Sequence, residues 1–247
     1  MSNAVDFDPF ARFRAVTRAR IGLGRVGDGL PTRAVLDFQL SHARARDAVH
    51  GQADFAALRK RLAPLGVLHV RSRARDRSTY LTRPDLGRRV HPDDLATIEA
   101  GAHDVAFVIA DGLSAAAVDK QAEGVLKACL KRLGDLQIAP IVLGEQARVA
   151  FGDEAGAALG ARIVVVLIGE RPGLSVPDSL GAYITFAPEV GRRDSERNCV
   201  SNIHADGLSH EAAADKIAWL VRQALHLGLT GVDLKEDAGA NGLIGGA

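Results

Sequence analysis

Short continuous apolar runs alternate with stretches of helical periodicity in the second part of the chain. The apolar runs cover residues 104–110, 138–144, 163–169 and 182–187, and helical patterns separate the first three of them. Continuous apolar runs are typical of strands that are buried on both faces of a mostly parallel sheet. The pattern therefore predicts a Rossmann-like α/β domain over residues 92–247, with helices on both faces of the sheet.

Helical periodicity dominates residues 1–91, which we expect to form a helical N-terminal segment. Asp8 followed by Pro9 is a typical helix start, because proline suits the first helical position. The pattern predicts three helices and one strand here, over residues 8–20, 32–49, 54–62 and 66–70. We place a domain boundary near residue 91, between this segment and the Rossmann-like domain.

The composition is that of an ordinary globular protein, with 47% hydrophobic and 25% charged residues. The net charge of +1 creates no strong field for nucleic acid or anionic lipid, and the 4% aromatic share offers no stacking platform for bases. No apolar run reaches the roughly 18 residues of a membrane span, and the two cysteines make no disulfide framework. We expect a soluble, cytoplasmic protein.

Residues 22–27 read GLGRVG and match the G-x-G-x-x-G spacing of dinucleotide-binding loops. That fingerprint requires a strand before the glycines and a helix that begins within them. A basic helix is predicted before these glycines instead, and the turn-forming sequence DGLP follows them. We interpret the motif as a glycine-rich connector, and a stand-alone nucleotide-dependent α/β enzyme is the alternative.

Residues 71–90 are rich in arginine and also contain Asp76 and Asp85. A basic run can bind RNA, but the whole-chain charge and the absence of interleaved aromatic residues weigh against it. Arginines mixed with aspartates more often form ion pairs with a partner chain or contact an anionic cofactor. We favour such a contact, narrowly over a solvated loop and clearly over an RNA-binding module.

Polar residues follow two of the predicted strands directly. Open α/β sheets bind their ligands at this carboxyl end of the strands. Asp111 and Gly112 come after residues 104–110, and Gly112 would let the backbone approach a ligand. An ordinary turn with Ser114 as helix cap explains this loop at least as well. If the sheet is doubly wound, this loop and Glu170 lie on the same edge.

Glu170 follows the apolar run 163–169 and precedes Arg171 and Pro172. Because Pro172 restricts its own backbone and that of the residue before it, the position of the carboxylate is set by the chain. A surface ion pair between Glu170 and Arg171 is the alternative. We favour a ligand contact, since the loop is otherwise tight and apolar.

Cys199 lies in the polar segment 197–202, which we expect to be a loop. With His204 nearby, Cys199 could be a nucleophile, but no hydrolase or cysteine-protease signature surrounds it. A small residue that packs on a ligand or on the core fits better. None of the histidines forms a pair at metal-ligand spacing, so we expect no metal site.

Several segments together resemble the small (light) subunit of ethanolamine ammonia-lyase, over about residues 9–228. The segments are RIGLGRVGDGLPTRAVLDFQLSHARARDAVH, RSRARDRSTYLTRPDLGRRV, IADGLSA, ARVAFGDEAGAALGARIVVVLIGERPGL and ERNCVSNI. The resemblance implies a subunit of an ammonia-lyase, EC 4.3.1.7, which uses adenosylcobalamin to convert ethanolamine to acetaldehyde and ammonia. GERPGL and RNCVSN are its most specific parts.

The resemblance also implies that the cofactor lies between this chain and a large subunit, a TIM barrel that holds the substrate. The family's cobalamin contacts fall on Val149, Glu170 and Cys199, and the N-terminal helices become subunit contacts. The chain has no D-x-H-x-x-G, so it lacks the signature of a histidine ligand below cobalt. Because the chain begins close to the shared region, residence in a bacterial microcompartment stays open.

Overall fold

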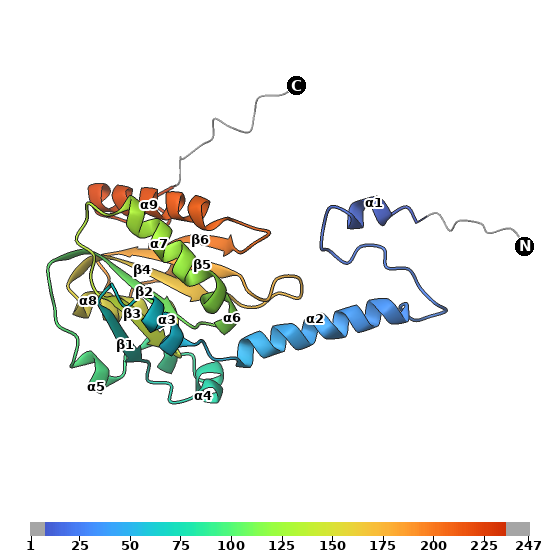
Figure 1. The fold of residues 1–247 in the computed structure, drawn as a ribbon, viewed down its shortest axis with the longest axis horizontal. Coiled ribbons are helices and arrows are strands. Elements are labelled where there is room, and N and C mark those ends of the chain that lie inside the picture. Colours follow the sequence, from blue (N-terminus) through green and yellow to red (C-terminus); the bar gives the residue numbers. More distant parts are fainter. Residues whose placement is uncertain (1–7, 236–247) are drawn as a thin grey trace, which may run out of the picture.

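One six-stranded sheet organises the fold in the computed structural model, which describes residues 8–235 (Figure 1). The strand order is β1-β3-β2-β4-β5-β6. The strands β1, β3, β2 and β4 run parallel to one another, whereas β5 is antiparallel to both β4 and β6. The prediction of a mostly parallel α/β sheet is therefore confirmed. The strands are β1 (Val67–Arg71), β2 (His103–Ala110), β3 (Ile141–Glu145), β4 (Ala161–Gly169), β5 (Leu180–Phe186) and β6 (Asn198–Ile203).

Helices pack on both faces of this sheet. Residues of α3, α7 and α9 share one apolar core with the strands, and residues of α8 share the other. The helices are α1 (Ala11–Arg14), α2 (Thr32–His50), α3 (Phe55–Arg61), α4 (Arg77–Thr82), α5 (Pro92–Leu95), α6 (Ala115–Ala117), α7 (Glu123–Arg132), α8 (Phe151–Ala158) and α9 (His210–Leu227). A π-helical turn, Val118–Ala122, joins α6 to α7.

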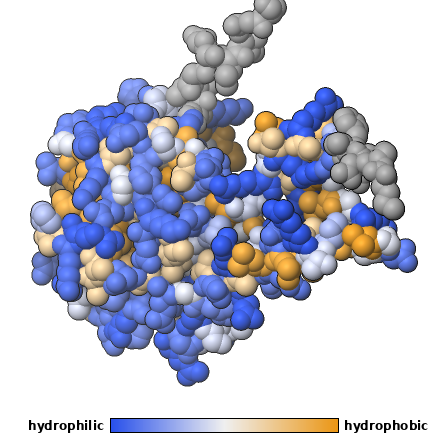
Figure 2. Space-filling model, turned by 45° about the vertical axis from the view of Figure 1, so that its right-hand side comes forward, coloured by the Kyte–Doolittle hydropathy of each residue, from blue (hydrophilic) through white to orange (hydrophobic). Residues whose placement is uncertain are grey.

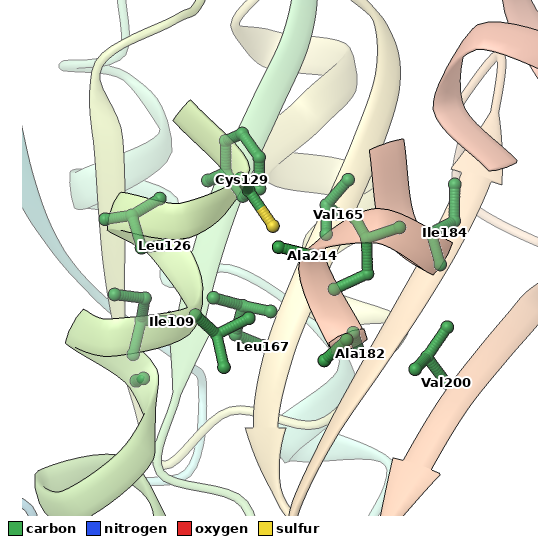
Figure 3. Packing of buried hydrophobic residues seen from close by; sticks show 14 of the residues in the cluster. Ile109, Leu126, Cys129, Val165, Leu167, Ala182, Ile184, Val200 and Ala214 are labelled. Atoms are coloured by element: carbon green, nitrogen blue, oxygen red, sulfur yellow. The ribbon is translucent and has the colours of Figure 1, made fainter. Parts of the chain in front are cut away.

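The central strand β4 shows why its sequence is apolar throughout. Ile163, Val165 and Leu167 face one core, and Val164 and Val166 face the other. Each of these side chains is fully buried, which stabilises the fold by roughly 1.5–3 kcal/mol per side chain. On the first of these faces, side chains of α7 and α9 close over the strands, as Cys129 and Ala214 do in Figure 3.

Three predicted elements differ from the structure. The first helix is limited to Ala11–Arg14, because no residue of it reaches a core that would stabilise a longer helix. The helical pattern of residues 93–100 predicts a helix of that length, but α5 ends at Leu95. The polar segment expected to be a loop is instead mostly strand β6, whose Val200 and Ile203 are buried while the side chains between them lie exposed at the sheet edge.

The N-terminal helix α2 extends away from the sheet and, with α1, forms what we call the N-terminal arm (Figure 1). Apolar side chains lie on the surface of this arm (Figure 2). The large apolar side chains exposed between residues 8 and 50 are Phe10, Phe13, Val16, Val26, Leu30, Leu36, Phe38 and Leu40. In the described part of the chain, no helix is both long and apolar enough to cross a membrane.

The glycine-rich sequence over residues 22–27 joins the two helices of the N-terminal arm. Gly22, Gly24 and Gly27 have φ values of 53°, 78° and 60°, which residues other than glycine rarely adopt. Between residue 8 and these glycines the structure has the helix α1 and no strand, and no helix begins within the glycine-rich sequence. The interpretation of this sequence as a connector is confirmed. The glycines lack the strand–loop–helix context on which the nucleotide-binding alternative depended.

The strand β1 comes before the proposed boundary near residue 91 but pairs with β3 along its whole length. The edge of the sheet is thus built by the N-terminal part of the chain. The division of the chain at residue 91 and the Rossmann-like description stay predictions.

Candidate functional site

Three parallel strands end level with one another at a groove. In the register of the sheet, Ala110 at the end of β2 pairs with Gly144 of β3 and Ile168 of β4. The segments that follow these strands form a groove of about 460 Å³. Its lining residues are Tyr80, Gly112, Leu113, Arg148, Val149, Ile168, Gly169, Glu170, Arg171 and Tyr183.

Two of the predicted contact residues, Val149 and Glu170, line this groove together. Val149 lies in the loop between β3 and α8, where its side chain is partly buried against the second core. Glu170 directly follows β4. Sheet pairing thus brings together two residues that are far apart in the sequence.

The Glu170 carboxylate is fixed by its neighbours. The Ser179 hydroxyl donates a 2.5 Å hydrogen bond to Oε2, and the backbone N–H of Asn202 donates a longer one, 3.4 Å, to the same oxygen. Oε1 has no hydrogen-bond partner among residues 8–235, and Glu170 forms no ion pair there with Arg171. The surface ion pair considered from the sequence is therefore absent from the described chain, and a positioned acceptor lies at the groove.

Cys199 lies on β6, outside the lining of the groove. It borders a separate hollow of about 420 Å³ and pairs across the strands with Tyr183, which does line the groove. Burial raises the pKa of both the Tyr183 hydroxyl and the Cys199 thiol above their ordinary values. Cys199 is thus connected to the groove through Tyr183.

The nucleophile interpretation of Cys199 gains no support from the geometry. A raised pKa keeps the thiol protonated at neutral pH, whereas nucleophilic cysteines need a lowered one. His204 uses both ring nitrogens elsewhere: Nε2 lies 2.8 Å from the Asn202 side chain, and Nδ1 accepts from the Asp206 backbone.

Asp111 supports the loop that carries Val149 and is itself buried. Its carboxylate accepts hydrogen bonds of 3.0–3.1 Å from the backbone N–H groups of Gly112, Gln146 and Ala147. Burial raises the pKa of Asp111 to about 6, although Arg77 acts in the opposite direction. Gln146 has a φ of 53°, so this carboxylate stabilises a backbone conformation that its residue disfavours.

Gly112 and Ser114 mainly serve the turn after β2. Gly112 has a φ of 58°, and a Cβ at this position would lie 2.3 Å from the Gly169 carbonyl oxygen. Ser114 accepts from the backbone N–H of Ala117 and donates to the Pro177 carbonyl oxygen at 2.7 Å. The close approach that glycine permits is therefore to the chain itself, beside the groove.

The arginine-rich segment forms ion pairs within the chain. Arg89 makes two hydrogen bonds to the Glu154 carboxylate, at 2.8 and 3.0 Å, and Arg71 pairs with Asp94. These contacts fasten the segment to α8 and α5. Tyr80, in the same segment, lines the groove, and no sequence pattern predicts this position.

The sheet edge, the groove and the fixed acceptor define an α/β protein with a candidate ligand site. The family model of the ethanolamine ammonia-lyase light chain (EutC) matches residues 7–235. The chain is 57% identical to the ethanolamine ammonia-lyase small subunit of Rhodopseudomonas palustris, over 91% of this chain and 89% of that one. It is 53% identical to the small subunit of Bradyrhizobium diazoefficiens, over 95% and 93% of the two chains. For the small subunit of Azotobacter vinelandii the identity is 52%, over 94% and 89%.

The chain belongs to the family of ethanolamine ammonia-lyase small subunits. It is therefore a subunit of a lyase, as the resemblance in its sequence implied.

Proposed function

We propose that this small subunit binds adenosylcobalamin at the groove, in contact with the large subunit of ethanolamine ammonia-lyase, and that Val149, Glu170 and Cys199 contact the cofactor. The observation that carries the proposal is the fixed Glu170 carboxylate, whose Oε1 lacks a partner in the described chain. Such an oxygen can accept a hydrogen bond from a cofactor amide or ribose hydroxyl without reorganising. The Tyr183–Cys199 pair extends the contact surface to β6.

The groove fits part of a cobalamin. The corrin has an apolar face and neutral amide side chains, and the groove offers the apolar Val149 beside the acceptor Glu170. The Nε atom of Arg148 is a buried donor without a partner in the described chain. A groove of about 460 Å³ covers only a portion of so large a cofactor, which is consistent with a second wall from a partner chain. When bound, the cofactor supplies homolysis of its cobalt–carbon bond, while the protein binds and orients it.

We propose that the N-terminal arm contacts the large subunit, a TIM barrel that holds ethanolamine. Its exposed apolar side chains need a cover in the assembly. The arm also contacts the segment that joins β4 to β5, because Arg18 donates to the Ser175 carbonyl oxygen at 3.2 Å, and Arg18 pairs with Asp206 between β6 and α9. A cytoplasmic complex is part of the proposal; packaging in a microcompartment is a separate question for fractionation of the cell.

The test is an ammonia-release assay on this chain, on the large subunit and on both chains together, each with and without adenosylcobalamin. We expect activity only when both chains and the cofactor are present. The Glu170→Ala variant should need a higher adenosylcobalamin concentration for half-maximal activity, because the fixed acceptor is lost. Activity of the isolated small subunit, or an unchanged half-maximal concentration in the variant, would contradict the proposal.

A further inference from the structure

One arginine of the groove has no carboxylate to neutralise it. Arg148 follows β3, directly precedes Val149 and lines the groove. It forms no ion pair within residues 8–235, and its Nε is buried without a hydrogen-bond partner there. A cation that becomes covered without a counter-charge is costly, so a group that binds here should carry negative charge.

The Arg148 side chain is already fixed in the groove. Its guanidinium lies 4.5 Å from the centre of the Tyr80 ring, and its Nη2 donates to the Tyr80 carbonyl oxygen at 3.1 Å. Its backbone N–H donates to the Gly87 carbonyl oxygen at 2.8 Å. Because Asp111 accepts hydrogen bonds from the two preceding N–H groups, the whole loop is anchored. A ligand would meet a preorganised donor.

A second arginine on the same ring provides an internal comparison. The Arg77 guanidinium lies 4.7 Å from the centre of Tyr80, and it pairs with the Asp111 carboxylate at 3.6 Å. Arg77 does not line the groove. Of the two arginines that flank Tyr80, Arg77 lies outside the groove and pairs with a carboxylate. Arg148 lies in the groove and pairs with no carboxylate among residues 8–235.

On the basis of the proposed cobalamin site, we infer that Arg148 binds the phosphodiester of the cofactor's nucleotide loop. The corrin side chains of cobalamin end in neutral amides, so the phosphodiester is the anionic group of its periphery. A planar guanidinium suits phosphate because it can donate two parallel hydrogen bonds. Arg171, the other arginine of the groove, is exposed, and its side chain makes none of the contacts with residues 8–235 that anchor Arg148, so it is a weaker candidate.

The test compares two probes on the reconstituted two-chain complex. Cyanocobalamin carries the phosphodiester, and aquacyanocobinamide lacks the nucleotide loop. Equilibrium dialysis gives the Kd of each probe for wild type, Arg148→Met, Arg148→Lys and Arg88→Met. Arg88 is an exposed arginine outside the groove, so its variant controls for the loss of one positive charge.

Arg148→Met should weaken cyanocobalamin binding at least tenfold and leave cobinamide binding within twofold, while Arg88→Met changes neither. Arg148→Lys keeps the positive charge but loses the planar guanidinium, so its affinity for cyanocobalamin should fall about threefold and its affinity for cobinamide should not change. This variant provides the test if Arg148→Met fails to assemble with the large subunit. Equal losses for both probes would overturn the inference and point to a corrin amide or a carboxylate of the partner chain. Unchanged binding would also overturn it. A wild-type complex that binds neither probe would instead contradict the cobalamin proposal itself.

Discussion

The buried ion pair between Asp153 of α8 and Arg197 at the start of β6 should be a major determinant of stability. The two side chains are 1% and 2% exposed. Nη1 and Nη2 of Arg197 donate hydrogen bonds of 2.5 and 2.7 Å to the two carboxylate oxygens. Arg197 also donates to the Thr185 hydroxyl at 3.0 Å and to the Arg192 carbonyl oxygen at 2.9 Å. The guanidinium thus joins three segments of the chain.

Asp153→Ala would leave the buried guanidinium with only the exposed Asp194 carboxylate, 3.6 Å from Nε, as a counter-charge. Breaking comparable buried pairs costs about 3–5 kcal/mol. We expect the free energy of unfolding to fall by about this amount, a large part of the roughly 5–15 kcal/mol of a typical domain. Urea unfolding of the full chain at pH 7, followed by circular dichroism, measures the change. The double variant Asp153→Leu with Arg197→Met removes both charges, so it should be more stable than Asp153→Ala.

Arg222→Met is the matched control, because Arg222 pairs with Asp135 in two strong hydrogen bonds on an exposed surface. Its loss should cost less than about 1 kcal/mol. A loss of stability for Asp153→Ala no larger than that of this control would refute a stabilising role of the buried pair. It is also refuted if the double variant is as unstable as the sum of its two single variants.

Three further predictions concern the strand ends and the groove. Because burial raises the pKa of Asp111 to about 6, the folded chain retains this proton where the unfolded chain has lost it. The free energy of unfolding of the wild type, relative to that of Asp111→Asn, should therefore fall by up to about 3 kcal/mol between pH 4 and pH 6. A difference between the two proteins that stays constant across this pH range in urea unfolding would contradict the prediction. Gly27→Ala should lower the free energy of unfolding by about 1 kcal/mol, because its φ is positive. Gly112→Ala should lower it further, because its φ is also positive and its new Cβ would clash with the Gly169 carbonyl oxygen. Equal falls in the melting temperature of the two variants would refute the clash. Cys199 should react with iodoacetamide at pH 7.5 more slowly than the same cysteine in an unstructured peptide of residues 197–203, because its pKa is raised in the folded chain. An equal or faster rate in the folded chain would count against the protonated thiol.

Much of the sheet could be predicted from the sequence because its central strands are apolar on both faces. The continuous run of β4 is the clearest case, since two cores bury it. The edge strand β6 was not predicted, because the side chains at its exposed positions are polar and its sequence therefore resembles that of a loop. The first helix was predicted too long, since its phenylalanines suggested a buried face that the chain does not provide.

The candidate site was predictable only in part. Glu170 could be located because a strand end and a proline define it within a few residues of sequence. Arg148 and Tyr80 could not, because their contact depends on how the arginine-rich segment packs against the loop after β3. That segment was interpreted mainly as a contact with a partner or cofactor, whereas several of its arginines pair with carboxylates of the same chain, as Arg89 does with Glu154.

The most direct measurement of the central claim is the Kd of adenosylcobalamin for the reconstituted complex, with wild-type chain, Glu170→Ala and Glu189→Ala. Glu189 is an exposed carboxylate outside the groove, so its variant controls for the loss of one negative charge. A hydrogen bond to a charged acceptor contributes about 1.5–3 kcal/mol, so Glu170→Ala should raise the Kd at least tenfold, while Glu189→Ala leaves it within twofold. An unchanged Kd for Glu170→Ala would contradict the assignment of the groove to the cofactor.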